Sequence, residues 1–152
     1  MSHTPVNHPL RPLYRVLAGL TGLYVLVFGI AGVVETSGTD LFGHPSEYAL
    51  GLRTNLAFSI ISVVAGLIIL VATVIGRNLD YRVNQVAGYA FAGMGVLMLA
   101  LLQTDANILN FSVATCVVSF VISLVLLTAG LYSKVGNDDD VAAEEAFQGR
   151  RA

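Results

Sequence analysis

Four long segments of this chain contain no Asp, Glu, Lys, Arg or His. They are residues 16–34, 54–76, 83–104 and 106–133. An α-helix rises about 1.5 Å per residue, so about 20 residues cross the roughly 30 Å of hydrocarbon in a bilayer. Each segment is therefore long enough to form a transmembrane helix.

The overall composition agrees with lipid as the solvent of these segments. The chain is 55% hydrophobic and only 12% charged, whereas roughly a quarter of the residues in soluble domains are charged. A small soluble bundle would need a polar face on most of its helices, and the four segments have none. The first segment is also too long for a secretory signal, whose apolar part is about 7 to 15 residues, so we interpret it as an uncleaved span.

These observations predict an all-α integral membrane protein, an antiparallel bundle of four transmembrane helices. We place the bundle at residues 13–134, between a loose cytoplasmic N-terminus at 1–12 and an acidic cytoplasmic tail at 135–152. The polar tail is expected to be disordered, with at most a short helix after Asp140. The second segment aligns with the fourth, with Ser62 and Leu67 matching Ser119 and Leu124. This match could reflect a tandem duplication of a two-helix hairpin or chance similarity between apolar helices, and both interpretations stay open.

Basic residues are distributed unevenly between the ends of the four segments. Seven of the eight fall on one side: Arg11, Arg15, Arg77, Arg82, Lys134, Arg150 and Arg151. Positive residues in short loops favour the cytoplasmic side of a membrane. The sequence therefore predicts that both termini and the connection between the second and third segments face the cytoplasm.

Each segment carries two small residues spaced one helical turn apart. Helices in lipid associate through close packing, and such small pairs are typical of helix contacts. The pairs are Ala18 and Gly22, Ser62 and Gly66, Gly88 and Ala92, and Ser119 and Ser123. We interpret them as helix-packing residues, with serines lining a polar path as the weaker alternative, because a helical serine can bond its own preceding turn. Whether these faces meet one another or a partner protein stays open at this point.

The chain offers few candidates for chemistry. Arg53 is the one basic residue on the outer side, and we predict an outer-rim pair between Arg53 and Asp105 that clamps the hairpins together. One histidine, His44, near Asp40 and Glu47 is a weak pattern for a metal, and we predict no metal site. We find no phosphate-binding loop, no nucleophile motif and no basic stripe for nucleic acid, and we predict no catalytic residue and no cofactor.

Four strings are more specific than an apolar composition alone would produce: "LAGLTGLYVLVFGIAG", "ALGLRTN", "VIGRNLDYRVNQ" and "LQTDANILNFSVATCVVSFVISLVLLTAGLY". In these strings, over roughly residues 13–134, the chain resembles a family of small four-span membrane proteins of actinobacteria, domain of unknown function 4383. The resemblance implies a multi-pass protein of the bacterial plasma membrane and brings no activity or site residues. Some relatives have a histidine-asparagine element early in the second span, where this chain has Phe58 and Ser59.

The absence of charge inside the spans limits the functions to consider. Charged groups within a membrane are usually retained for proton relays, ion sites or substrate pairing, so an ion-coupled transporter is not favoured. We expect a structural or accessory protein that acts through helix-helix contacts with itself or another integral membrane protein in the lipid bilayer. The alternative is a small oligomeric transporter or channel for an uncharged or lipid-like substrate. We do not expect an enzyme.

Overall fold

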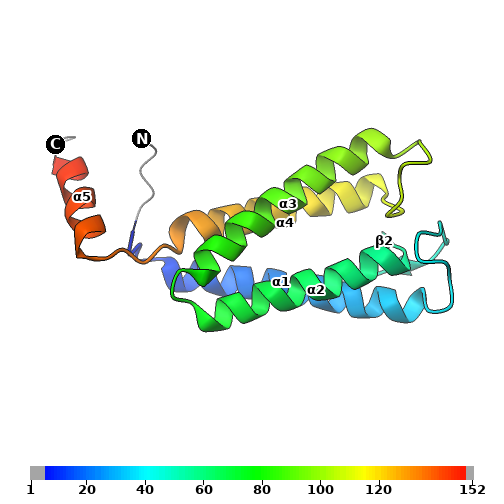
Figure 1. The fold of residues 1–152 in the computed structure, drawn as a ribbon, viewed down its shortest axis with the longest axis horizontal. Helices are drawn as coiled ribbons and strands as arrows, with labels where there is room; N and C mark the ends of the chain where they lie inside the picture. Colours follow the sequence, from blue (N-terminus) through cyan, green and yellow to red (C-terminus); the bar gives the residue numbers. More distant parts are fainter. Residues whose placement is uncertain (1–5, 150–152) are drawn as a thin grey trace.

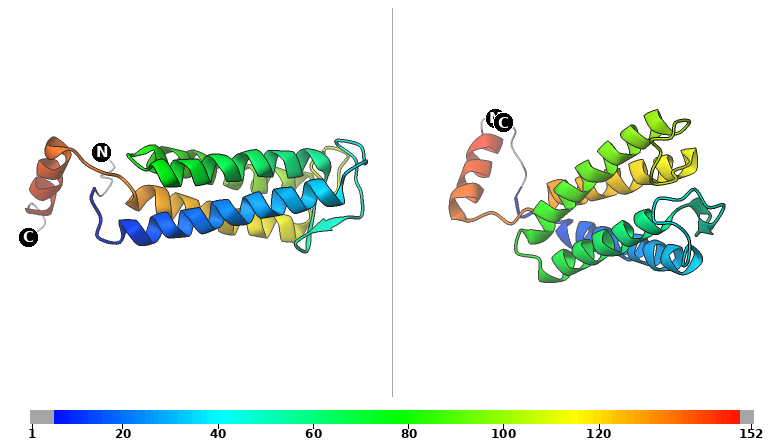
Figure 2. Two further views of the ribbon diagram at one scale, coloured as in Figure 1. Left: turned by 90° about the horizontal axis from the view of Figure 1, so that it is seen from below. Right: turned by 45° about the vertical axis from the view of Figure 1, so that its right-hand side comes forward.

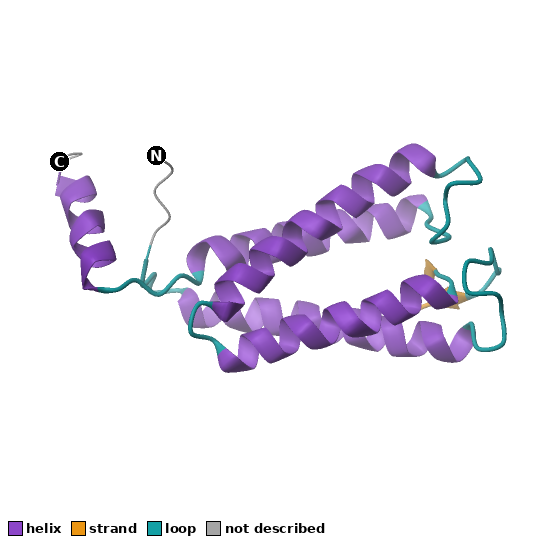
Figure 3. Cartoon of the chain, viewed as in Figure 1, coloured by secondary structure: helices purple, strands orange, loops and turns teal. Residues whose placement is uncertain are grey.

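The computed structural model describes residues 6–149, apart from the side chains of Glu144 and Gln148. Its elements are α1 (Arg11–Glu35), β1 (Tyr48–Ala49), β2 (Leu52–Arg53), α2 (Leu56–Ile75), α3 (Leu79–Leu101), α4 (Val113–Tyr132) and α5 (Asp138–Gly149). The four long helices lie side by side, and α5 stands apart from them at the end where the described chain begins (Figure 1, Figure 3).

The four long helices confirm the predicted four-helix membrane bundle. Each of α1 to α4 is long and apolar enough to cross a membrane, with mean hydropathies of 2.2, 2.8, 1.4 and 2.4. We call the end of the bundle with the start of α1 and the α2–α3 turn the terminal end. The opposite end, with the β1–β2 hairpin and the α3–α4 connection, is the loop end (Figure 1).

Polar side chains cap the two helices that begin at the loop end. The Asn55 side chain accepts a hydrogen bond from the backbone N–H of Phe58 and starts α2. Ser112 and Thr115 form a reciprocal capping box at the start of α4. Such caps satisfy N–H groups that a helix leaves unpaired in its first turn. The cap at Ser112 explains why α4 begins at Val113, later than the predicted segment at 106–133.

The bundle consists of two closely packed hairpins. Helix α1 packs mainly against α2, and α3 against α4 (Figure 2). Glycines permit the close approach: a Cβ at Gly66 on α2 would lie 2.5 Å from the backbone nitrogen of Leu26 on α1. In the other hairpin, a Cβ at Gly88 would lie 2.7 Å from Cγ of Leu127. A side chain at either position would force the helices apart.

Contacts between the two hairpins are sparser than contacts within them. Two apolar clusters join the hairpins, one near the loop end around Phe58, Phe111 and Cys116 and one around Ile69 and Leu126. Helices α2 and α3 diverge toward the loop end (Figure 1, Figure 2).

The structure describes part of the two segments that flank the bundle. Residues 1–5 of the predicted loose N-terminus lie outside the described residues. Asn7 is held against the end of α4, because its N–H donates to the Lys134 carbonyl oxygen at 3.0 Å. In the tail, where we expected disorder with at most a short helix after Asp140, α5 begins at Asp138. The three aspartates of its first turn are favourable there, because the helix N-terminus carries partial positive charge.

The internal duplication stays a prediction. The two hairpins run in the same order, and the matched positions agree in burial: Ser62 and Ser119 are both buried, and Leu67 and Leu124 are both exposed.

Candidate functional site

The predicted helix-packing residues face the interior of the chain. Those that are buried are Ala18, Gly22, Ser62, Gly66, Gly88, Ser119 and Ser123, and Ala92 is half-buried. The hydroxyl of Ser62 donates to the Phe58 carbonyl oxygen at 2.8 Å, and that of Ser119 donates to the Thr115 carbonyl oxygen at 2.9 Å. These bonds back to the preceding turn leave the hydroxyls occupied, so the geometry favours packing over a polar path.

The predicted outer-rim pair is not brought together. No ion pair among residues 6–149 joins Arg53 to Asp105. Asp105 is exposed in the α3–α4 connection, eight positions before the start of α4 at Val113. The prediction assumed that residue 105 stood at the helix start, and that assumption does not hold.

Three buried asparagines, which we call the asparagine clamp, join the α1–α2 and α3–α4 connections at the loop end instead. The Asn55 Nδ2 donates to the carbonyl oxygens of Ile108 at 2.8 Å and Gly43 at 3.2 Å. The Asn110 Nδ2 donates to those of Thr54 at 2.9 Å and Pro45 at 3.0 Å.

The third member, Asn107, shapes the α3–α4 connection itself. Its Oδ1 accepts from the Phe111 N–H at 2.9 Å, and its carbonyl oxygen lies 3.0 Å from Nε2 of His44. The clamp therefore satisfies backbone groups that would otherwise be buried without partners, and it fixes the loop end without an ion pair.

Replacing Asn110 by glycine should weaken the clamp without straining the backbone. Asn110 has a φ of 54°, which glycine adopts freely. The change leaves the carbonyl oxygens of Thr54 and Pro45 unpaired, so we expect the free energy of unfolding to fall by about 1–3 kcal/mol. Unfolding in mixed micelles with increasing SDS would measure the loss.

The matched control for that experiment is Asp105→Ala in the same connection. Asp105 is exposed, so its removal should change stability by less than about 0.5 kcal/mol. A larger loss for Asp105→Ala than for Asn110→Gly would show that the aspartate, and not the clamp, holds the loops.

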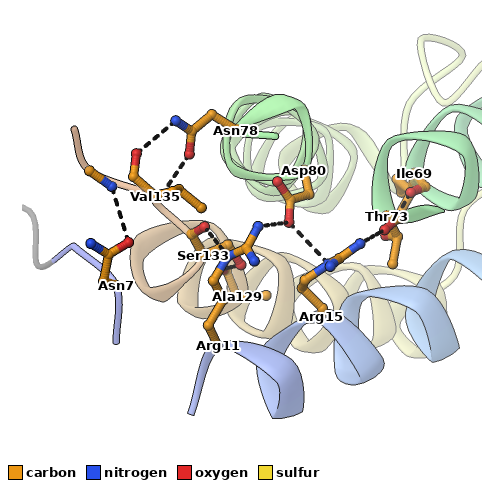
Figure 4. A network of polar contacts seen from close by, with 11 residues as sticks. Asn7, Arg11, Arg15, Ile69, Thr73, Asn78, Asp80, Ala129, Ser133 and Val135 are labelled. Atoms are coloured by element: carbon orange, nitrogen blue, oxygen red, sulfur yellow. Dashed lines mark hydrogen bonds and ion pairs between the residues drawn. The ribbon is translucent and has the colours of Figure 1, made fainter. Parts of the chain in front are cut away.

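The terminal end contains an ionic cluster that the sequence analysis missed. Asp80, in the first turn of α3, is fully buried. Its Oδ2 lies 3.4 Å from Nη2 of Arg11 and 3.3 Å from Nε of Arg15, both on α1 (Figure 4). Nε of Arg11 also donates to the carbonyl oxygen of Ser133 at 2.8 Å, just after α4. One carboxylate thus connects the starts of α1 and α3 and the end of α4.

Part of this cluster lacks hydrogen-bond partners within the described protein. Oδ1 of Asp80 has none, and neither does Nδ2 or Oδ1 of Asn84, which lies one turn further along α3 and is fully buried. Buried polar groups are nearly always paired with protein or with ordered water. Asp80 and Asn84 are therefore buried polar residues whose hydrogen-bonding capacity the described protein leaves partly unused.

An exposed hollow lies between α2 and α3. We call it the seam and define it by its lining residues, Ala65, Ile68, Ile69, Arg82, Val83, Val86 and Ala87. Its volume is about 310 Å³. A further hollow of about 120 Å³ shares Ala65 with the seam and extends along α2 to Phe58 and the loop residues Leu109 and Phe111. Arg82 is the one charged residue among the lining residues of the two hollows.

The interior of the bundle contains much less space. A cavity of about 20 Å³ is lined by Phe28, Phe58, Ser62, Ser119 and other side chains from all four long helices. A site needs about 10–15 Å³ to hold one water molecule, so this cavity has room for about one. Within the described residues, no group of three or more His, Cys, Asp or Glu side chains is arranged to hold a metal.

The model of a domain of unknown function, DUF4383, matches residues 15–132. The chain belongs to this family. No curated protein and no solved structure matches the chain.

The segment matched by the DUF4383 model coincides with the bundle. It begins at Arg15 in the first turns of α1 and ends at Tyr132, the last residue of α4. It therefore includes the asparagine clamp, Asp80 and the seam, whereas Arg11 and α5 lie outside it. The family's description assigns no activity, so function has to be argued from the geometry.

Proposed function

We propose that this DUF4383 protein is an accessory membrane protein that works by contact, with the seam as the surface that receives a transmembrane helix of a second copy or of another membrane protein. The observation that supports this proposal is the apolar hollow of about 310 Å³ between α2 and α3. The small-residue pairs are already used inside the chain, so they are not free to recruit a partner.

The seam has the properties that helix association in lipid requires. Such association depends on close packing, because lipid tails are as apolar as the helices themselves. Ala65 on α2 and Ala87 on α3 both line the hollow, and their small side chains leave room for a partner's side chains. We assign no catalytic reaction to the protein.

The proposal predicts that filling the seam releases the partner. In Ala87→Phe, the aromatic ring would occupy the hollow, and we expect the mass of the complex extracted with its surrounding membrane to fall to that of the single chain. Ala100→Phe, at an exposed position of α3 that does not line the seam, is the matched control and should keep the complex. An unmodified chain that is already a lone monomer in such extracts would contradict the proposal.

The second candidate is a small oligomeric transporter or channel for an uncharged or lipid-like substrate. It is favoured by the lateral opening of the seam and its continuation toward the loop end. The interior cavity of about 20 Å³ does not support passage through a single chain, so several copies would be needed. Solute flux into liposomes that is lost in Ser62→Leu and Ser119→Leu would favour this candidate over the accessory role.

We also propose that the protein lies in the plasma membrane of an actinobacterium, with both termini in the cytoplasm. The concentration of Arg11, Arg15, Arg77, Arg82 and Lys134 at the terminal end supports this orientation through the preference of basic residues for the cytoplasmic side. Reporter enzymes fused at residue 152 and within the loop at residues 36–47 would report opposite sides.

A further inference from the structure

Another hollow, separate from the seam, lies at the terminal end. It is lined by Arg11 and Arg15 at the start of α1, by Gly76 and Arg77 in the α2–α3 turn, and by Val135 after α4. Its volume is about 480 Å³, within the roughly 300–1,000 Å³ of small-molecule sites. We call it the arginine hollow.

The wall of the arginine hollow is fixed by hydrogen bonds. Nδ2 of Asn78 donates to the Val135 carbonyl oxygen at 2.8 Å, and the Val135 N–H donates to Oδ1 of Asn78 at 2.6 Å (Figure 4). These two bonds hold the chain that leaves α4 against the α2–α3 turn.

The arginine hollow carries an excess of positive charge. Asp80 pairs with Arg11 and Arg15, whereas Arg77 is exposed and has no ion pair within residues 6–149. Three arginines thus line the hollow, and the Asp80 carboxylate pairs with two of them. Guanidinium groups bind phosphate oxygens with paired hydrogen bonds, so the charge favours a phosphate-bearing ligand.

The turn positions the arginines beside one another. Arg15 donates to the Thr73 carbonyl oxygen on α2 and lies over Gly76, where a Cβ would be 3.1 Å from its Nη2. Gly76 has a φ of 66°, and Arg77 follows with a φ of 51°. Positive φ is uncommon for a residue with a side chain, and here it occurs at the residue that adds the third guanidinium to the hollow.

An apolar groove begins where the arginine hollow ends. It has a volume of about 450 Å³ and is lined by Val16, Gly19, Leu20 and Leu23 on α1 and by Leu70 on α2. Arg15 lines both spaces, so the charged part and the apolar part adjoin. Val16, Leu20 and Leu23 are exposed, which places the groove on the lipid-facing surface of the bundle.

We propose that the arginine hollow and this groove bind one anionic phospholipid. The phosphate lies among Arg11, Arg15 and Arg77, and an acyl chain lies in the groove between α1 and α2. A free phosphate would match the arginines but leave the groove unused, and a neutral lipid would match the groove but leave the excess charge unmatched. The two adjoining parts match the two parts of an anionic lipid.

The test measures which lipid the whole protein retains. The protein is placed in nanodiscs with equal amounts of phosphatidylglycerol and phosphatidylcholine, and retained lipid is counted by native mass spectrometry. We expect one phosphatidylglycerol molecule in preference to phosphatidylcholine. Arg77→Gln should lower its retention about fivefold, the effect of one arginine at an anionic surface.

Two further variants separate this site from its alternatives. Arg82→Gln is the matched control, because Arg82 is exposed near the same turn but lines the seam, and it should retain the lipid. Gly19→Phe should lower retention by filling the groove. A Cβ at Gly19 would meet only Thr73 among the described neighbours, at 3.4 Å, so the variant should fold. If Gly19→Phe does not fold, the comparison of Arg77→Gln with Arg82→Gln still tests the proposal.

Three results would overturn the proposal. The first is equal retention of the two lipids, and the second is an equal loss in Arg77→Gln and Arg82→Gln, which would show a general surface attraction. The third is complete displacement of the lipid by millimolar inorganic phosphate, which would show that the groove contributes nothing.

Discussion

Asp80→Ala should destabilise the bundle more than any other single removal of charge. Asp80 is fully buried, whereas the side chains of Arg11 and Arg15 are 22% and 31% exposed. Breaking a buried ion pair costs about 3–5 kcal/mol, because the remaining charge is left uncompensated. Both arginines keep some contact with solvent, so we expect a loss of about 3 kcal/mol in the free energy of unfolding, at the lower end of that range.

The loss should depend on the two arginines. In the Asp80→Ala background, Arg11→Gln and Arg15→Gln should lower the free energy of unfolding much less than they do in the unmodified chain. A double-mutant cycle, measured by SDS unfolding, would give the difference. Asp138→Ala, at an exposed carboxylate in the first turn of α5, is the control and should leave the bundle unchanged. An Asp80→Ala protein as stable as the unmodified chain would show that the cluster does not hold the terminal end together.

Gly66→Ala should disrupt the first hairpin although it adds only one methyl group. The new Cβ would lie 2.5 Å from the backbone nitrogen of Leu26 and 2.7 Å from its Cα. Backbone atoms cannot move aside as a flexible side chain can, so α1 and α2 must separate. Overpacking of this kind costs about 1–3 kcal/mol, and SDS unfolding would again measure it.

Gly93→Ala is the matched control for Gly66→Ala. Gly93 is also in the interior of a long helix, but a Cβ there would meet nothing within 4 Å. Alanine is the better helix former by about 0.5–1 kcal/mol, so this variant should be as stable as the unmodified chain or slightly more stable. If Gly66→Ala behaved in the same way as Gly93→Ala, the close approach of α1 and α2 would not be a source of stability.

The bundle could be predicted because its determinants are local in the sequence. Each span is a long segment without charge, and the length of such a segment alone decides whether it can cross a bilayer. The pairs containing Gly66 and Gly88 could be recognised as packing residues for the same reason, since their spacing lies within one helical turn. Their partners could not be identified, because the same spacing serves a contact within the chain or between chains.

The clamp and the ionic cluster depend on contacts between residues far apart in the sequence. In the sequence, Asp80 stands between Arg77 and Arg82, a pattern typical of a solvated loop, whereas in the structure it is buried and pairs with Arg11 and Arg15, about 70 positions away. The start of α4 was misplaced because residues 106–112 carry no charge. The signal that could have corrected it was the presence of Asn107 and Asn110, whose side chains commonly bond to the backbone of turns.

The seam between α2 and α3 is the surface through which we propose that this protein contacts its partner. The direct measurement is site-specific cross-linking in native membranes, with Cys116, the buried native cysteine, replaced by alanine. Ile68 lines the seam, so a photoactivatable group attached to Ile68→Cys should give a protein adduct of defined mass. Leu67 is exposed but lies outside the seam, so the same group attached to Leu67→Cys should give only lipid adducts. Equal protein adducts at both positions, or none at Ile68→Cys, would contradict the claim.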